Sequence, residues 1–364
     1  MFWLVCLIAF AIHHWHPKRI LNFQSIGTDS AISTDETLVH FVVYRIMVAC
    51  ALYHILMAIT MFRIKDENDS RLVLETGFWP LKMLLIFGLC FSFLFIPQNI
   101  IRHLFWPGII SAGIFLLLQV ILLVDLACTI AEYFVSKYEE TEGAIYKWSL
   151  IGLTALFYGA IGVAAYWLIK TFTETTDRIM ILSNLIMTII LSGFSLLNKV
   201  QEAHAGAGIF PAAFIGTYNS FLLATALYSK KSIIEESKDD ILSILGAIFG
   251  LLSITYSAFS SGQDSHKLGI SSQHSGNSTP FSKKENESPY GYSFFHLMFA
   301  MASFYVALLI TQWKQAFVDE AKSTIVIEHT KGTFWARLSM SWLLALLYIW
   351  TLFAPVLFPG RHFV

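Results

Sequence analysis

The sequence predicts an all-α polytopic membrane protein that crosses the bilayer about ten times. Of its 364 residues, 56% are hydrophobic and only 13% are Asp, Glu, Lys or Arg, and the mean hydropathy is +0.62. This apolar content exceeds what the core of a soluble protein of this size needs. Apolar runs of about 20 residues, the length that spans the hydrocarbon of a bilayer, recur along the chain between polar segments. We therefore expect a single membrane domain over residues 1–364.

Charge, cysteines and motifs exclude several functional classes. The formal net charge is −1, and no block of like charge suggests a nucleic-acid partner. Each of the four cysteines lies within an apolar run, so we expect no structural disulfides. No GxSxG, Walker, HExxH, CxxC or GxGxxG pattern occurs in a suitable context. We therefore expect no enzyme activity, no cofactor and no metal.

Hydropathy and flanking Trp, Tyr, Lys and Arg place the candidate spans. They cover residues 1–13, 38–62, 78–96, 104–135, 146–169, 179–197, 209–228, 241–259, 292–313 and 334–358. The first is short, has no basic leader or cleavage site, and is expected to be a retained span or anchor. In the fifth, Ala155, Gly159 and Gly162 form a seam of small residues, which predicts close approach of a second helix backbone.

The segment 260–290 differs from the other loops because it is rich in Ser and Gly and holds almost no apolar residues. It cannot bury enough surface to offset its ordering entropy, so we expect disorder. The loops do not decide orientation: ten Lys and Arg fall on the side of the termini and eleven on the other. Glycosylation sequons at Asn68, Asn277 and Asn286 would be used only if the side of the termini were lumenal.

The fourth span predicts an unusually long helix. If it begins with Pro107 at its first position and runs to Phe134, it is about 42 Å long at ~1.5 Å per residue. This exceeds the ~30 Å of bilayer hydrocarbon, so the helix must tilt strongly or project beyond the membrane.

Asp125 lies deep inside this apolar span, where an ionised carboxylate costs several kcal/mol unless it has a partner or water (about 3 on insertion scales). Thr129 and Glu132 continue the same helical face. Lys82 in the third span is a candidate counter-charge. One interpretation is a hydrophilic furrow for lipid head groups or a small polar solute. The other is a structural ion pair or hydrogen bond between helices.

Other polar residues have both structural and functional interpretations. Asn184 and His296 are single polar groups in apolar spans, typical of interhelical hydrogen bonds. Lys199 and Glu202 indicate either a solvated turn or a head-group contact. The sequence HHWHP at residues 13–17 suggests a metal site, but it lacks further ligands at a recognisable spacing, and a membrane boundary is the favoured interpretation.

Several sequence blocks together resemble the serine incorporator family, also called Serinc or TMS proteins. The blocks are GFWPLK (77–82), FIP (95–97), QVILLVDLA (119–127), KVQE (199–202), YSFFHLMFAMASFYVALLITQW (292–313) and SWLLALLYIWTLFAPVLFPGRHF (341–363). The matching order covers nearly the whole chain from Val42 onward, and the last two blocks are the most specific.

The resemblance implies ten helices with cytosolic termini, arranged as two helical bundles crossed by a long tilted helix. It also implies residence in an endomembrane or the plasma membrane, with the Ser-rich loop and the sequons in the cytosol. The family was named for delivering serine to phosphatidylserine and sphingolipid synthesis. Its members are also associated with passive phospholipid scrambling, and some with antiviral activity.

The chain departs from the family pattern in three ways. It has no cysteine-rich segment before the first span, it lacks the lumenal cysteines of larger members, and CTIAEYF replaces the polar residues that usually follow the VDLA block. Functions that depend on an extracellular face are therefore in doubt.

Three functional hypotheses remain: lipid movement between leaflets along a polar furrow, an accessory role in serine incorporation, and secondary transport of a polar solute such as serine. The partners to consider are membrane lipids, lipid-synthesising enzymes and further copies of the chain.

Overall fold

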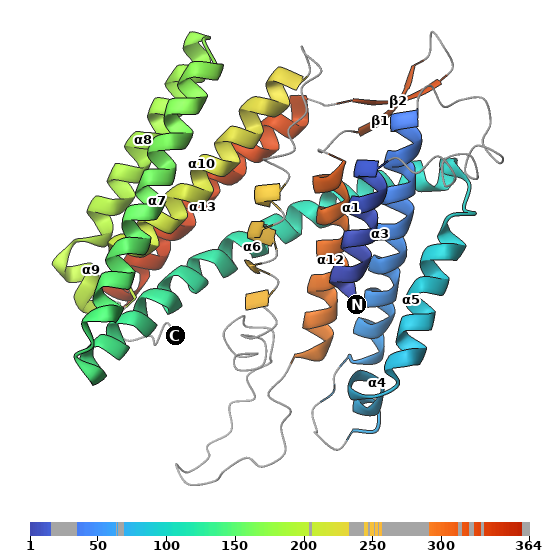
Figure 1. The fold of residues 1–364 in the computed structure, drawn as a ribbon, viewed down its shortest axis with the longest axis horizontal. Coiled ribbons are helices and arrows are strands. Elements are labelled where there is room, and N and C mark those ends of the chain that lie inside the picture. Colours follow the sequence, from blue (N-terminus) through green and yellow to red (C-terminus); the bar gives the residue numbers. More distant parts are fainter. Residues whose placement is uncertain are drawn as a thin grey trace. The chain divides into compact units, whose positions relative to one another are not determined.

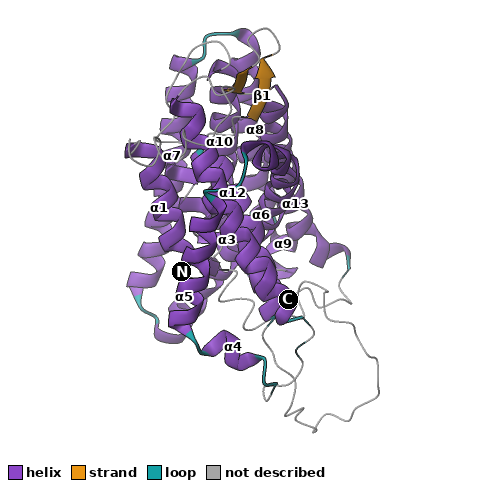
Figure 2. Cartoon of the chain, turned by 90° about the vertical axis from the view of Figure 1, so that its right-hand side faces the viewer, coloured by secondary structure: helices purple, strands orange, loops and turns teal. Residues whose placement is uncertain are grey.

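Helices form nearly all of the described structure (Figures 1 and 2). The computed structural model describes residues 1–15, 35–62, 64, 69–203, 206–232, 291–311, 315–319, 324–328 and 331–358, with short helical pieces between residues 244 and 256. Within these residues, seven helices are long and apolar enough to cross a membrane, and α1 (Phe2–Trp15) and α5 (Trp79–Phe93) are shorter apolar helices. The all-α polytopic class is confirmed, and the count of ten spans stays a prediction.

The chain divides into two compact units that interleave along the sequence. Unit 1 comprises Met1–Phe115 and Ile254–Glu328, and unit 2 comprises Leu116–Ser253 and His329–Val364. The longest helix, α6 (Gln98–Thr141), contributes its first part to unit 1 and its second part to unit 2. This division matches the expected pair of helical bundles that share one long helix. The tilt of that helix and the single domain over 1–364 stay predictions.

Several predicted features fall on residues that the structure does not describe. The loop 260–290 and the three sequon asparagines lie outside the described residues, and the predicted eighth span, 241–259, is described only in short helical pieces.

Unit 1 is built around α3 (Asp35–Thr60), which packs against α1, α5 and α12 (Tyr292–Ile310) (Figure 1). Every residue of α3 from Leu38 to Ala51 is buried. A helix that is apolar all round is stable only where neighbours enclose it, which explains the central place of α3. The short helix α4 (Leu72–Thr76) precedes α5.

A β-hairpin in unit 1 departs from the all-helical prediction. β1 (Gln315–Asp319) pairs antiparallel with β2 (Thr324–Glu328), with Phe317 opposite Val326. Only four residues connect the strands, a length typical of hairpins. Hydropathy did not indicate the hairpin because it lies in a polar connection between two spans.

Unit 2 is built around α10 (Ile209–Ser232), which packs against α7 (Ala144–Thr171), α8 (Thr175–Ser195) and α13 (Lys331–Leu357). Nearly all of α10 from Phe210 to Ser229 is buried, whereas α7 exposes most of its apolar side chains. In a membrane protein such exposed apolar faces contact lipid tails, so α7 forms part of the lipid-facing surface of this unit.

Helix α6 begins earlier than the sequence indicated. It starts at Gln98 and runs for 44 residues through Pro107, about 66 Å at ~1.5 Å per residue. The prediction of a start at Pro107 is therefore wrong. The carbonyl of Pro97 accepts the bonds from Ile100 N–H and Ile101 N–H that open the helix. An interior proline removes one backbone bond, which membrane helices tolerate more readily than soluble ones.

The first part of α6 is fixed to α3 by aromatic packing. The ring of Phe105 stacks on Tyr44 with centroids 4.0 Å apart and meets Phe41 edge-on at 6.0 Å. At Gly108 a Cβ atom would collide with the hydroxyl of Tyr44 and would lie 3.0 Å from the ring of Phe304. A residue without a side chain is therefore needed where these helices meet.

The predicted seam of small residues on α7 does not mediate close helix packing. Ala155, Gly159 and Gly162 are exposed, and no described atom lies within 4 Å of a Cβ built on either glycine. The close approach occurs instead at Gly216 on α10, where a Cβ would lie 2.7 Å from Thr188 Cγ2 and 3.1 Å from Ile161 Cδ1. Small residues allow close packing only where a partner helix faces them.

Gly216→Ala should destabilise the protein by about 1–3 kcal/mol, the usual cost of overpacking a well-packed core. Thr188 cannot easily yield, because it is stiff at χ1 and its hydroxyl donates to the carbonyl of Asn184 at 3.0 Å. Thermal unfolding in detergent measures the effect. Gly159→Ala is the matched control and should be neutral or stabilising by up to about 1 kcal/mol. Equal melting temperatures for the two variants would contradict this packing.

Candidate functional site

The polar stripe on α6 combines one partly buried carboxylate with exposed polar groups. Asp125 is partly buried, and Thr129 and Glu132 are exposed. On the opposite side of the same turns, Val124 and Ala127 are buried in the apolar core of unit 2. The stripe therefore borders the exposed side of a helix whose other side is anchored in protein.

Lys82, the predicted counter-charge, has described partners in its own unit. Its ammonium group donates to the backbone carbonyl of Glu75 and lies 4.6 Å from the ring centroid of Trp79. Lys82 belongs to unit 1 and Asp125 to unit 2. Pairing between Lys82 and Asp125 therefore stays a prediction.

Asn184 lies in a buried hydrogen-bond network that joins three helices of unit 2. Its amide donates to Ser220 Oγ at 2.9 Å, and its Oδ1 accepts from the amide of Asn219 at 2.8 Å, both on α10. Ser341 on α13 donates to Asn219 Oδ1. These bonds satisfy polar groups that have no access to water, and they fix α8, α10 and α13 to one another.

His296 is the middle member of a second buried group, in unit 1. Its Nε2 lies 2.9 Å from Glu75 Oε2, and its Nδ1 lies 3.0 Å from Nδ1 of His54 on α3. Both imidazoles are almost fully buried. The group joins α12 to α3 and α4, because His296 lies 242 positions after His54 and 221 after Glu75.

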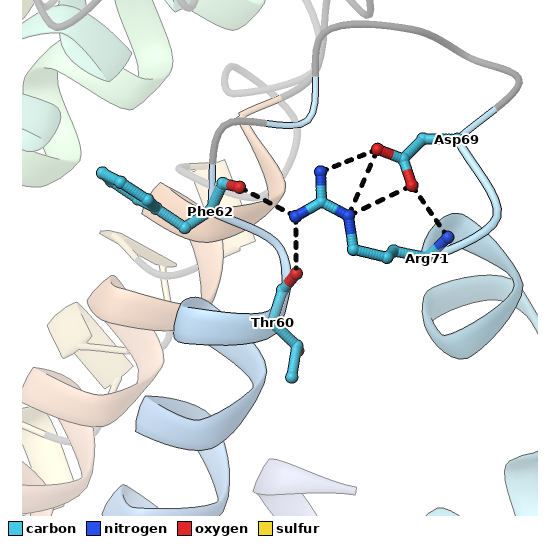
Figure 3. A network of polar contacts seen from close by, with 4 residues as sticks. All are labelled: Thr60, Phe62, Asp69 and Arg71. Carbon is cyan, nitrogen blue, oxygen red and sulfur yellow. Dashed lines mark hydrogen bonds and ion pairs between the residues drawn. The ribbon is translucent and has the colours of Figure 1, made fainter.

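An arginine clamp lies at the start of α4, the helix that carries Glu75 (Figure 3). The guanidinium of Arg71 binds both carboxylate oxygens of Asp69, with Nη2 2.7 Å from Oδ2. Its Nη1 donates to the carbonyls of Thr60 and Phe62 at 3.3 and 3.0 Å, at the end of α3. Arg71 thereby ties the short helix that carries Glu75 to the helix that carries His54.

A charged cluster lies where α10 ends near the start of α8. Lys230 Nζ contacts Glu174 Oε2 at 2.5 Å and Asp177 Oδ1 at 2.7 Å. On α13, Arg337 donates to the carbonyl of Thr225 at 2.6 Å and to Ser229 Oγ at 2.7 Å. These contacts join α8 and α13 to the last turns of α10.

The remaining predicted residues have ordinary surroundings. Lys199 and Glu202 are exposed on α9 (Asn198–Ala203). His13 contacts the ring of His40, and His14 stacks on Phe10. His16 lies outside the described residues, within which no three His, Cys, Asp or Glu side chains are grouped to hold a metal. All four cysteines are free.

Sequence reasoning missed several members of these groups. Glu75 lies in the short helix α4 before GFWPLK, and nothing in its local sequence marks it as bonded to a histidine. Asn219, Ser220 and Ser341 lie in apolar spans. Their polarity within those spans is the sequence feature that could have identified them. His54 carried that signal but had no predicted partner.

Comparisons with known proteins agree on one family. A family model described as "Serine incorporator (Serinc)" matches residues 1–288 and 270–361. A "Probable serine incorporator" of Dictyostelium discoideum is 31% identical over 99% of this chain and 92% of the relative. "Serine incorporator 3" of Mus musculus is 30% identical over 94% of this chain and 84% of the relative. A "Probable serine incorporator" of Nematostella vectensis is 28% identical over 95% and 86%.

The arginine clamp should make stability depend on acid pH. Hydrogen bonds from Arg71 hold the pKa of Asp69 below its ordinary value. The stabilisation is therefore full above the unfolded pKa of about 3.9 and is lost as the pH falls through the lower folded value. Asp69→Asn should lower the melting temperature at pH 7, and its difference from the unsubstituted protein should shrink as the pH falls below about 3.9.

Thermal unfolding in detergent at several pH values measures this effect. Glu202→Gln, which neutralises an exposed carboxylate on α9, is the control and should change little at any pH. A difference between Asp69→Asn and the unsubstituted protein that stays constant down to pH 3 would contradict the account.

Proposed function

The chain belongs to the serine incorporator family of multi-pass membrane proteins, and from this membership we propose that it acts on membrane lipids. Its proposed activity is passive scrambling, the movement of phospholipids between leaflets without coupled energy. The proposed path is the stripe of Asp125, Thr129 and Glu132 on α6. Support of serine incorporation into phosphatidylserine and sphingolipids is the second proposed role.

The observation that carries this proposal is polar exposure on a membrane helix. Thr129 and Glu132 are exposed and Asp125 is partly exposed, although α6 is otherwise strongly apolar. Moving a charged head group through hydrocarbon is slow because the group must give up its hydration. Carboxylates along the helix can replace part of that hydration, and they attract the cationic groups of zwitterionic head groups.

This proposal requires no covalent chemistry. A path that lowers the free energy of the head group in the membrane accelerates movement in both directions, and the lipid gradient sets the net direction. Lipid-synthesising enzymes and further copies of the chain are proposed partners. We propose residence in an endomembrane or the plasma membrane, with both termini in the cytosol.

The alternative is transport of a small polar solute, with serine as the candidate that the relatives' printed names suggest. The acidic stripe suits the ammonium group of serine but repels its carboxylate, which needs a cationic partner. Lipid movement needs only the stripe and is therefore the simpler function.

Asp125→Asn should slow lipid exchange about 5- to 10-fold, equivalent to about 1–1.4 kcal/mol in the barrier. The assay uses purified full-length protein in liposomes that contain a fluorescent lipid, with a membrane-impermeant quencher reporting lipid that reaches the outer leaflet. Uptake of labelled serine is measured on the same liposomes. Glu202→Gln is the control, since it removes a carboxylate outside α6 and should exchange lipid normally.

The outcomes separate the hypotheses. Lipid movement that falls in Asp125→Asn but not in Glu202→Gln, without serine uptake, supports scrambling along the stripe. Serine uptake without lipid movement favours a solute transporter. The absence of both favours an accessory role. Unchanged lipid exchange in a well-folded Asp125→Asn protein would exclude Asp125 from the path.

A further inference from the structure

Two buried histidines and a partly buried glutamate form a continuous hydrogen-bonded chain in unit 1, separate from the α6 stripe. Glu75 Oε2 lies 2.9 Å from His296 Nε2, and His296 Nδ1 lies 3.0 Å from His54 Nδ1. The other nitrogen of His54, Nε2, is buried and has no hydrogen-bond partner among the described residues. The chain thus has a terminal nitrogen that neither donates nor accepts a bond.

Aromatic rings enclose the inner end of this chain. Phe299 stacks on His54 with centroids 5.1 Å apart, and Phe2 and Tyr53 meet it edge-on at 5.9 and 5.1 Å. The outer end is more open, because 20% of the Glu75 side chain is exposed against 5% for His296. One end of the chain therefore reaches toward solvent, and the other end is packed against aromatic rings.

Each contact in this chain holds one shared proton, which allows two complete arrangements. In the first, Glu75 is a carboxylate, His296 donates from Nε2, and His54 donates from Nδ1, leaving a lone pair on His54 Nε2. In the second, Glu75 is a carboxylic acid that donates to His296 Nε2, His296 donates from Nδ1 to His54 Nδ1, and His54 Nε2 carries a proton. Every internal bond is satisfied in both arrangements.

We propose that Glu75, His296 and His54 form a proton relay that moves one proton between solvent at Glu75 and the buried Nε2 of His54. When local opening of the surrounding rings admits a hydronium ion, that ion gives a proton to His54 Nε2 and leaves as water. The Nδ1 proton of His54 then passes to His296 Nδ1, and the Nε2 proton of His296 passes to Glu75 Oε2. One proton enters, one appears on the carboxyl group, and each of the two shared protons crosses one hydrogen bond.

The transfer distances suit this step, since 2.9 and 3.0 Å are ordinary hydrogen-bond lengths. The relay therefore gives this bundle a proton-binding activity distinct from lipid movement.

Charged and titratable groups from each neighbouring helix act on this relay. From α5, Lys82 donates to the backbone carbonyl of Glu75 rather than to its carboxylate. From α1, the amino group of Met1 acts on His54, and from α3, Tyr53 lies within electrostatic reach of Glu75. Among these described groups, Glu75 is the acid that both histidines can reach by proton transfer.

Solid-state NMR of full-length protein with ¹⁵N-labelled histidine, reconstituted in liposomes, tests the relay between pH 8.5 and 5. Its ¹⁵N shifts distinguish the two neutral tautomers and the imidazolium. The signal missing from the His54→Gln spectrum identifies His54, and the signal missing from the His296→Gln spectrum identifies His296. The two signals should change together in one coupled titration. Glu75→Gln should lower the midpoint of His296 by about one pH unit or more, the range expected for coupled groups.

The control is His103→Gln, which removes an exposed histidine of the same unit and should leave both signals unchanged. If Glu75→Gln does not fold, the spectra of the unsubstituted protein still show whether His54 and His296 titrate together. Independent titration of His54 and His296, one fixed tautomer across the whole range, or a His296 midpoint unmoved in folded Glu75→Gln would each overturn the relay.

Discussion

The organisation of this protein depends on the rule that polar groups inside a membrane must find partners within the protein. Arg45 on the buried helix α3 donates to the carbonyl of Ile96 at 2.8 Å. In unit 2, Asn184 bonds two residues of α10. Because lipid tails provide no hydrophobic drive between helices, such bonds and close packing decide which helices associate. Each unit therefore has a central, almost fully buried helix with polar contacts to its neighbours.

The same rule separates structural polar residues from candidate functional ones. The amides of Asn184 and Asn219 and the hydroxyl of Ser341 satisfy one another inside unit 2. Thr129 and Glu132 on α6 are exposed instead, so their side chains lie on the surface of the described structure. The relay in unit 1 lies between these cases, because its bonds are made within the protein but leave His54 Nε2 unmatched. Exposure of the α6 stripe and incomplete pairing at His54 are the observations on which the two proposals depend.

The sequence predicted the helical membrane fold because spans of this length and apolarity have no other stable structure in a bilayer. It predicted Asn184 and His296 as polar groups within spans but could not supply their partners, which lie 35 or more positions away along the chain. The start at Pro107 was wrong because proline does not end a membrane helix when the chain before it stays helical. The seam at Gly159 was wrong because periodic small residues do not reveal which face meets a partner. Whether Asp125 acts in a path was beyond the sequence, since that depends on what lies against the helix.

The central claim, that the α6 stripe provides a wet path at membrane depth, is tested most directly by spin-label accessibility. A label at Thr129→Cys, in a protein whose own cysteines are replaced, is compared in liposomes with a label at Ile121→Cys, an exposed apolar position of the same helix. The account predicts that a water-soluble relaxation agent reaches position 129 far better than position 121. Equal protection of both positions from that agent, with equal access to oxygen dissolved in lipid, would contradict it.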